Sequence, residues 1–251
     1  MTDVSLQNTD SRFFRKIHQR AGQAIHEYGL ISEGDSIVVG LSGGKDSLSL
    51  LDILSGRLRF SKVKFQLAAI HVAIRSIPYI VDNLYLKQFC EERDVPFFLI
   101  ETDLPSMEID HRDTCFVCSW NRRKILFDEA QQMGFRKLAL GHHKNDAVET
   151  LLMNMVFQGS ISSMPAKLSL FDEKLEIIRP LITLTNDELA EYACRKGFSE
   201  EIKRCPFEQI SKRHEIRKML GMLNETTPKA VDSIFASMGN IAGEYLPAKT
   251  K

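Results

Sequence analysis

The loop at residues 42–47 carries the residue types that would bind a polyphosphate. It follows an apolar run, DSIVVGL, and it precedes leucines spaced as in a helix. Glycines let backbone N–H groups approach an anion closely, and the N-terminus of a helix favours negative charge. Serine hydroxyls add further hydrogen-bond donors. We therefore expect the phosphates of a nucleotide to be bound by Ser42, Gly43, Gly44, Lys45, Asp46 and Ser47.

The spacing of this loop excludes two common nucleotide-binding motifs. A Walker-type loop needs four residues between its glycines and a hydroxyl residue after its lysine. Here three residues separate Gly40 from Gly44, and Asp46 follows the lysine. A dinucleotide-binding fingerprint would need a third glycine, which is missing at the required interval. Beside a polyphosphate, Asp46 is expected to bind magnesium; the alternative is an ordinary tight turn with Asp46 as the helix cap.

Two further segments place polar residues after apolar strands. In GHHKNDAVETLLMN, Gly141 ends a strand, two histidines follow, and Asp146 opens a helix. Taken alone, the block is most simply a helix start capped by its own Asn and Asp side chains, but beside the glycine loop this interpretation is the less favoured one. A zinc site at His142 and His143 is disfavoured because adjacent side chains diverge at a strand end. His71, in AIHVAI, is expected at the exit of another strand, where it either borders the nucleotide or is a core histidine.

The chain has five cysteines, and three of them have the setting of metal ligands. Cys115 and Cys118 form a CxxC motif expected in a turn before a helix, and Cys205 lies beside a proline in a predicted loop. A lone CxxC is compatible with zinc, disulfide exchange or an iron–sulfur cluster. Three thiolates on a [4Fe-4S] cluster would leave one iron open to another ligand. Cys90 and Cys194 lie in amphipathic helices and are expected to be buried.

Composition and charge place few limits on the partner. The 251 residues are 43% hydrophobic and 26% charged, with a formal net charge of zero. A nucleic acid would therefore have to be bound by a local basic patch, and a solvated helix face is the alternative for any such patch. Neither a signal peptide nor an apolar segment of membrane-spanning length is recognisable, so a cytoplasmic location without membrane contact is expected. The candidate RNA-binding cations are Arg12, Arg15, Lys16, Arg20, Arg195, Lys196, Lys203, Arg204, Lys212, Arg213, Arg217 and Lys218.

Five apolar strands alternate with helices, which is typical of a parallel sheet covered on both faces. The strands are expected in DSIVVGL, KFQLAAIHVAI, VPFFLIET, FRKLALGHH and LEIIRPLI. Ligands bind beyond the carboxyl ends of the strands in such sheets, and the candidate site segments lie there. A helical segment at 1–33 is expected to precede an α/β nucleotide-binding domain at 34–182. Helices at 183–251 would form a C-terminal extension that has no core of its own and carries Cys205.

The glycine loop and the GHH block together resemble the PP-loop ATP pyrophosphatases, which cleave ATP between the α- and β-phosphates. The resemblance implies a Rossmann-like fold of the adenine nucleotide α-hydrolase type. It also implies adenylation of a carbonyl-type oxygen, followed by displacement of AMP by a nucleophile. Asp46 and Asp146 would then hold magnesium together, and His71, Gly141 and His142 would border the nucleotide.

With the three cysteines added, the chain resembles one branch of that family, the tRNA 2-thiocytidine synthetases. The carrying stretches are GLSGGKDSLSLL, CFVCSWNRRKILF, LALGHHKNDAVETLLMNM, GSISSMPAKL, IIRPLI and CPFE. The branch implies ATP-dependent conversion of an anticodon-loop cytidine in tRNA to 2-thiocytidine, with a [4Fe-4S] cluster on Cys115, Cys118 and Cys205. A cysteine desulfurase or a persulfide carrier would supply the sulfur, and the resemblance is compatible with a homodimer.

Arg122 and Arg123 follow the CxxC motif, on what is expected to be the first turn of a helix. Two cations there oppose the helix dipole unless an anion lies nearby. The resemblance places both at the site, with Arg122 as a catalytic residue, and surface solvation is the alternative. The rival functions are another PP-loop tRNA-modifying enzyme, such as a uridine thiolase or a lysidine synthetase, and a zinc-bearing RNA-binding module without catalysis.

Overall fold

The computed structural model describes residues 2–75, 81–103, 114–170, 174–199 and 212–247, without the side chains of 2–9, 114–120 and 122. None of the described helices has the length and hydrophobicity needed to cross a membrane. The strands are β1 (Ser36–Gly40), β2 (Gln66–Ile74), β3 (Phe97–Thr102), β4 (Lys137–Ala139), β5 (Lys167–Leu170) and β6 (Leu175–Ile178). The helices are α1 (Thr2–Glu27), α2 (Lys45–Phe60), α3 (Asn83–Glu91), α4 (Thr114–Gln132), α5 (Lys144–Gln158), α6 (Asn186–Lys196), α7 (Lys212–Thr226), α8 (Ala230–Ser237) and the 3-10 helix η2 (Gly243–Tyr245).

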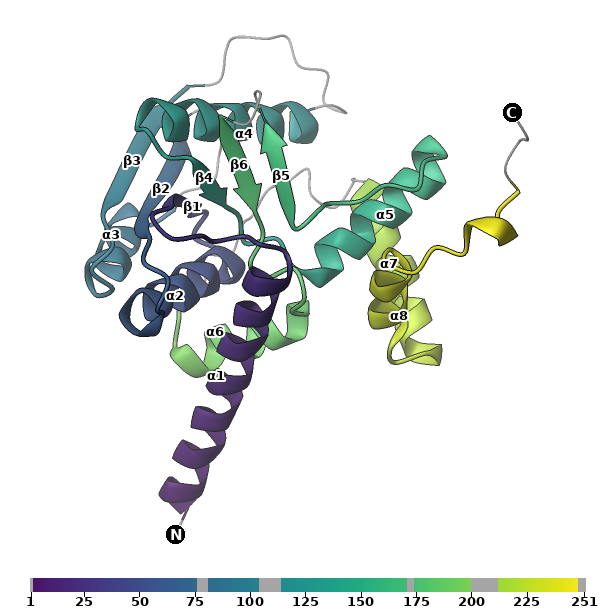
Figure 1. Cartoon of the computed structure of the whole chain (residues 1–251), viewed down its shortest axis with the longest axis horizontal. Helices are drawn as coiled ribbons and strands as arrows, with labels where there is room; N and C mark the ends of the chain where they lie inside the picture. The colour runs from purple at the N-terminus through teal and green to yellow at the C-terminus, as the bar shows by residue number, and fades with distance from the viewer. Residues whose placement is uncertain (1, 76–80, 104–113, 171–173, 200–211, 248–251) are drawn as a thin grey trace. The chain divides into compact units, whose positions relative to one another are not determined.

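The described strands form one six-stranded sheet in the order β3-β2-β1-β4-β6-β5 (Figure 1). Every neighbouring pair is parallel except β5 and β6, which are antiparallel. The expected five-stranded parallel sheet is therefore confirmed, and the structure adds an antiparallel sixth strand at one edge. The sequence does not predict β5 because three of its four residues are exposed, so it has no apolar run.

The strand order reverses at β1, which lies between β2 and β4. From β1 the sheet extends one way through β2 and β3, and the other way through β4 and β6. In open α/β sheets such a reversal leaves a crevice beyond the carboxyl ends of the two central strands, where ligands bind. The segments that leave these ends are residues 41–44 after β1 and residues 140–143 after β4. Two of the segments expected to form the site therefore meet at this point.

Helices cover both faces of the sheet (Figure 1). On one face α4 packs against β2 and β4, and its Leu126 and Ala130 join Val38, Ile70 and Leu138 of the strands in one buried cluster. On the other face α2 packs against β1 and β2, α6 packs against α2, and α1 packs against α6. The central strands are continuous apolar runs in the sequence because both of their faces are buried.

Two expectations about the positions of residues within elements are wrong. The expected turn at Cys115 and Cys118 is wrong, because both residues belong to α4, which begins at Thr114. No glycine or proline interrupts Thr114–Gln132, so the local sequence does not stop the helix from reaching Thr114. β2 ends at Ile74, as the expected strand KFQLAAIHVAI does, so the expectation that His71 lies at the strand's exit is wrong.

The chain forms two compact units: Met1–His143 with Pro165–Ser211, and Lys144–Met164 with Lys212–Lys251. In the second unit, a buried cluster joins Val148 of α5, Ile216 of α7 and Val231 of α8. The C-terminal helices α7 and α8 therefore share a core with α5. The division into three consecutive parts, 1–33, 34–182 and 183–251, stays a prediction.

The two helical cysteines have different surroundings. Cys90 in α3 is buried as expected, and burial raises the pKa of its thiol to about 12. Cys194 in α6 is exposed, contrary to expectation. The buried side of α6 is formed by Leu189, Tyr192 and Ala193, and Cys194 points away from it. Amphipathicity alone does not tell which side of the helix a single small residue occupies.

Candidate functional site

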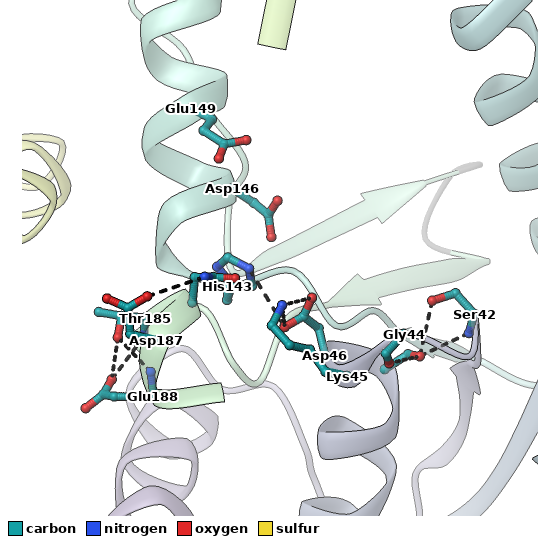
Figure 2. A network of polar contacts seen from close by, with 12 residues as sticks. Ser42, Gly44, Lys45, Asp46, His143, Asp146, Glu149, Thr185, Asp187 and Glu188 are labelled. Carbon is teal, nitrogen blue, oxygen red and sulfur yellow. Dashed lines mark hydrogen bonds and ion pairs between the residues drawn. The ribbon is translucent and has the colours of Figure 1, made fainter. Parts of the chain in front are cut away.

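The segment between β1 and α2 forms a tight turn at two glycines (Figure 2). Gly43 has a φ of 81°, in the left-handed region that glycine adopts without steric cost. Gly44 is the N-cap of α2, and no side chain caps this helix. The alternative in which Asp46 caps the helix is therefore wrong, since Asp46 is the second residue of α2. Helix N–H groups that no side chain caps are the donors that bind anions.

Ser42 and Ser47 close the loop by contacting each other. The backbone N–H of Ser42 donates to Ser47 Oγ at 3.1 Å, and the two hydroxyl oxygens are 3.2 Å apart (Figure 2). Ser47 Oγ also donates to the carbonyl oxygen of Gly44 at 2.9 Å. Because Ser47 is buried, its hydroxyl mainly holds the shape of the loop, whereas the backbone of the loop is left to meet a ligand.

Asp46 lies between two basic side chains. Lys45 Nζ is 3.0 Å from Asp46 Oδ1 and 3.1 Å from Oδ2, and His143 Nε2 is 3.9 Å from Oδ1. Despite these contacts, Asp46 Oδ1 is buried and accepts no well-aligned hydrogen bond from the part of the chain that the structure describes. Buried polar atoms normally have a partner, and a carboxylate oxygen with spare capacity suits a magnesium ion. The residues present therefore fit the expected metal.

Gly141 is the point at which the two loops touch. A Cβ added to Gly141 would lie 2.9 Å from the carbonyl carbon of Asp46 and 3.0 Å from the backbone nitrogen of Ser47. These are backbone atoms, which cannot rotate away from a methyl group as a side chain can. A glycine is therefore required at position 141 for the end of β4 to pack against the first turn of α2.

His71 contacts the backbone at the start of the glycine loop. Its side chain is buried, and its Nδ1 lies 2.6 Å from the carbonyl oxygen of Leu41, which can only accept a hydrogen bond. The N–H of Leu41 in turn donates to the carbonyl oxygen of Ile70 at 2.8 Å. His71 therefore fixes the residue at which β1 passes into the glycine loop, and this side-chain contact favours a supporting role in the core.

His142 contacts an arginine to which the sequence assigns no role. Arg179 follows β6, is only 6% exposed, and donates from Nε to His142 Nδ1 at 3.3 Å. Its Nη1 donates to the carbonyl oxygen of Pro165 at 2.6 Å. The available signal was a single arginine directly after the strand segment LEII, at its carboxyl end.

Asp146 lies in the first turn of α5, within the second unit. Its Oδ1 is 3.8 Å from Nη1 of Arg213 in α7. Arg213 and Arg217 also contact Glu149, a buried carboxylate one turn further along α5 that sequence reasoning missed. The pairing of Asp146 with Asp46 around magnesium stays a prediction. No group of three His, Cys, Asp or Glu side chains that could hold a metal occurs among the described residues, but magnesium on phosphates needs only one or two carboxylates.

Comparison with known proteins decides the family. Residues 11–220 match the family model described as a PP-loop domain. The chain is 34% identical over 236 residues to the tRNA-cytidine(32) 2-sulfurtransferase of Pseudoalteromonas atlantica, covering 92% of this chain and 74% of that protein. It is 36% identical to the protein of the same name from Shewanella sediminis, covering 90% and 72%. The chain belongs to the tRNA-cytidine 2-sulfurtransferase branch of the PP-loop family.

A solved structure has the same fold as this chain. The U34-tRNA thiolase NcsA from Methanococcus maripaludis, solved with its [4Fe-4S] cluster, superposes with a TM-score of 0.77 at 22% sequence identity. The match covers 95% of this chain and 81% of that chain. The Rossmann-like fold of the PP-loop family is therefore confirmed.

The remaining residues expected from the sulfurtransferase branch are only partly described. Cys115 and Cys118 lie in the first turns of α4, and Cys205 lies outside the described residues, so their role as cluster ligands stays a prediction. Because α4 begins at Thr114, Arg122 and Arg123 lie beyond its first turn, and the dipole argument for an anion beside them fails. The catalytic role of Arg122 stays a prediction, since its side chain is not described.

Several of the cations expected to bind RNA in this sulfurtransferase are already paired with carboxylates. Lys196 lies 3.1 Å from Asp52, and Arg213 and Arg217 contact Glu149. Such pairs leave less positive charge for phosphates, which favours the interpretation as ordinary helix faces at these positions. Arg20 likewise contacts Glu188, and Arg195 contacts Asp10 and Glu191, whereas Lys203 and Arg204 lie outside the described residues.

Proposed function

We propose that the protein is an ATP-dependent sulfurtransferase that converts a cytidine in the anticodon loop of tRNA to 2-thiocytidine. The observation that carries the proposal is the similarity to tRNA-cytidine(32) 2-sulfurtransferases over nine-tenths of the chain, in a protein whose sequence contains the glycine loop, Cys115, Cys118 and Cys205. The geometry of the loop supports the ATP half of the reaction. The three thiols support the sulfur half.

The glycine loop would bind the phosphates that leave as pyrophosphate. The start of α2 has no side-chain cap, and Gly43 and Gly44 leave the backbone accessible. Lys45 adds a positive charge beside the same helix end. Backbone N–H groups and a fixed cation stabilise negative charge that develops on a leaving group, without having to reorganise.

Asp46 is the residue proposed to hold magnesium, with Asp146 as its proposed second carboxylate. When bound, the ion would neutralise charge on the phosphates and orient them. Oδ1 of Asp46 has spare acceptor capacity. Lys45 Nζ contacts both oxygens of this carboxylate, so the carboxylate is positioned before a ligand arrives.

The proposed chemistry has two steps. The C2 oxygen of cytidine attacks the α-phosphorus of ATP, the bond to the β-phosphate bridging oxygen breaks, and pyrophosphate leaves with the electron pair. A sulfur nucleophile at the oxidation level of sulfide then bonds to C2, and AMP leaves with the former C2 oxygen. A cysteine desulfurase or a persulfide carrier, with a thiol reductant, is the proposed source of that sulfur.

Cys115, Cys118 and Cys205 are the proposed ligands of a [4Fe-4S] cluster. Bound by three thiolates, such a cluster supplies one iron that is open to a sulfur ligand. The thiolase from M. maripaludis, which shares the fold, carries a [4Fe-4S] cluster. A cytoplasmic location and a homodimer are further parts of the proposal. The two halves of the reaction can be tested separately.

The ATP half is tested by replacing Asp46. The protein is prepared without oxygen and supplied with ATP, magnesium, sulfide and a tRNA transcript that has a cytidine in its anticodon loop. Asp46→Asn is expected to lower the release of AMP and pyrophosphate by at least about 100-fold. Asp187→Asn is the matched control, because Asp187 is also the second residue of a helix but is exposed on α6. Formation of ADP in place of AMP would overturn the proposal.

The sulfur half is tested by iron and sulfide analysis of the anaerobic protein and by Cys205→Ser. We expect iron and sulfide in the wild type, and in the variant we expect tRNA-dependent AMP release without thiolation. Mass spectrometry of the tRNA nucleosides reads out the product. A thiouridine would contradict the choice of cytidine, and a protein that binds zinc and releases no AMP would contradict catalysis altogether.

A further inference from the structure

Arg179 is a buried cation joined to one of the two loops that meet at the strand-order reversal. It leaves the carboxyl end of β6, next to β4 in the sheet, and its side chain reaches His142. Two hydrogen bonds to the residues just before β5 hold Arg179 in place. Its Nη1 donates to the carbonyl oxygen of Pro165 at 2.6 Å, and its backbone N–H donates to that of Ala166 at 2.9 Å.

A guanidinium group can donate hydrogen bonds but cannot accept them. The contact of 3.3 Å between Arg179 Nε and His142 Nδ1 therefore requires Nδ1 to be unprotonated and to act as the acceptor. The single ring proton of His142 must then be on Nε2. Which nitrogen of a histidine carries the proton is set by the partner of the other nitrogen.

His71 shows the opposite arrangement. Its Nδ1 faces the carbonyl oxygen of Leu41 at 2.6 Å, and a carbonyl oxygen can only accept, so the proton of this ring is on Nδ1. His71 belongs to β2 and His142 follows β4, the two strands that flank β1. A carbonyl oxygen fixes the tautomer of His71, whereas a guanidinium group fixes that of His142. The difference follows from the partners and not from the residue type.

We propose that Arg179 is a positioning residue that holds His142 as the neutral tautomer with its proton on Nε2. In this form the imidazole acts as a hydrogen-bond donor, and it cannot use Nδ1 as a general base. The group that receives the bond would be a phosphate oxygen of the bound nucleotide, because His142 follows β4 at the crevice beyond the central strands. The identity of that acceptor rests on the proposed function, whereas the tautomer does not.

The tautomer is tested directly by NMR of the full-length protein labelled with ¹⁵N-histidine. Long-range ¹H–¹⁵N correlations distinguish protonated from bare ring nitrogens, and His142→Gln assigns the signals by their loss. We expect a bare Nδ1 and a protonated Nε2 for His142, and the reverse for His71. In Arg179→Met, the His142 signals should move toward a mixture of tautomers. A protonated Nδ1 at His142 in the wild type, or an unchanged pattern in folded Arg179→Met, would overturn the proposal.

Arg179→Lys covers the case in which Arg179→Met does not fold, because it keeps a buried cation and a donor. The lysine is expected to restore the bare Nδ1 if its ammonium reaches the ring. A lysine variant that is folded and has a protonated Nδ1 would also count against the assignment, provided its ammonium contacts the ring in a solved structure.

A double-mutant cycle on ATP affinity, measured by calorimetry, tests whether Arg179 affects ATP binding through His142. His142→Leu is expected to weaken ATP binding by about tenfold or more, as for loss of a hydrogen bond to a charged group. His142→Gln, whose amide can place an N–H near the position of Nε2, should lose less. If Arg179 acts through His142, Arg179→Met should have little further effect in the His142→Leu background. Additive losses would contradict the positioning role. An absence of ATP binding in the wild type would instead contradict the proposed function and leave the NMR result standing.

Discussion

At the scale of single residues, the site depends on a contact that leaves no room for a side chain. Gly141 packs against the backbone of Asp46 and Ser47, so the segment after β4 and the start of α2 are held at a fixed separation. The sequence shows a glycine at this position but cannot show what the missing Cβ would meet. Its importance therefore lies in packing between two loops, and a direct contact with the nucleotide is not needed to explain it.

Replacing Gly141 by alanine should displace the loop. The added methyl group would lie about 3 Å from backbone atoms, so either β4 or the first turn of α2 must move. We expect Gly141→Ala to lower the free energy of unfolding by about 1–3 kcal/mol and to weaken ATP binding. Denaturant unfolding measures the first effect, and calorimetric titration with ATP measures the second.

Gly221→Ala is the control for this substitution. Gly221 lies inside α7, and a Cβ added there would meet no described atom within 4 Å apart from the backbone of its own helix. Alanine there should stabilise the protein by about 0.5–1 kcal/mol through its better helix propensity. A Gly141→Ala protein with wild-type stability and wild-type ATP affinity would show that the close contact is unimportant.

At the scale of elements, a buried polar network connects α1, α2 and α6. The hydroxyl of Tyr192 donates to Asp52, which also contacts Arg93 at 3.0 Å and Lys196 at 3.1 Å. His18 Nε2 is 3.0 Å from the same hydroxyl, whose proton is engaged, so His18 donates to it. Burial alone would raise the pKa of Asp52, but the bond from Tyr192 and the two cations lower it overall.

This network predicts a loss of stability on acidification. Burial lowers the pKa of His18 below 6.5 in the folded protein, with Lys196 and Arg57 acting in the same direction and Asp52 opposing them. The unfolded chain therefore binds a proton near pH 6.5 before the folded protein does, and stability falls as the pH drops through that range. His18→Gln should show a shallower fall in unfolding free energy between pH 7.5 and about pH 5. Parallel curves for the two proteins, measured by denaturant unfolding, would contradict this.

A second ionic cluster connects α5 and α7. Glu149 has a side chain that is 7% exposed, and Arg213 and Arg217 contact it from α7. Because both arginines are partly exposed, they can recover water when the charge of Glu149 is removed. We therefore expect Glu149→Gln to cost about 1–3 kcal/mol, less than a fully buried pair, and to speed amide hydrogen exchange in α5 and α7.

The matched control is an exposed pair, Arg59 with Asp94, whose side chains are 58% and 86% exposed. Arg59→Gln should cost no more than about 1 kcal/mol, because water already solvates both charges. Equal losses for Arg59→Gln and Glu149→Gln would mean that burial of Glu149 contributes nothing.

Elements with strong local signals could be predicted from the sequence, and the others could not. α6 was predictable because Thr185 and Glu188 form a capping box at its start and Gly197 ends it in the left-handed conformation. The start of α4 and the edge strand β5 have no such signals. β5 exists because β6 offers it a pairing edge, which is a property of the folded sheet and not of the residues Lys167–Leu170.

At the scale of the whole molecule, the alternation of strands and helices predicted the parallel sheet and the end at which ligands bind. The strand order was not predictable, because it depends on which strands pair after folding. The candidate site was likewise only partly predictable from the sequence. Residue types identified Asp46 and the glycine loop, whereas the partner of His142 is Arg179, which the chain supplies from beyond another strand. Contacts between residues far apart in the sequence leave no local pattern.

The second compact unit is built from two stretches that the sequence separates widely. Val148 of α5 is made well before Ile216 and Val231, the residues that bury it. During synthesis on the ribosome, the apolar side of α5 that includes Val148 therefore stays exposed until α7 and α8 have been made. Any chain that stops short of α8 leaves apolar surface uncovered, which is the kind of surface that promotes aggregation and is recognised by chaperones. Synthesis of α7 and α8 thus completes the buried cluster that α5 begins, and it removes this exposed apolar surface.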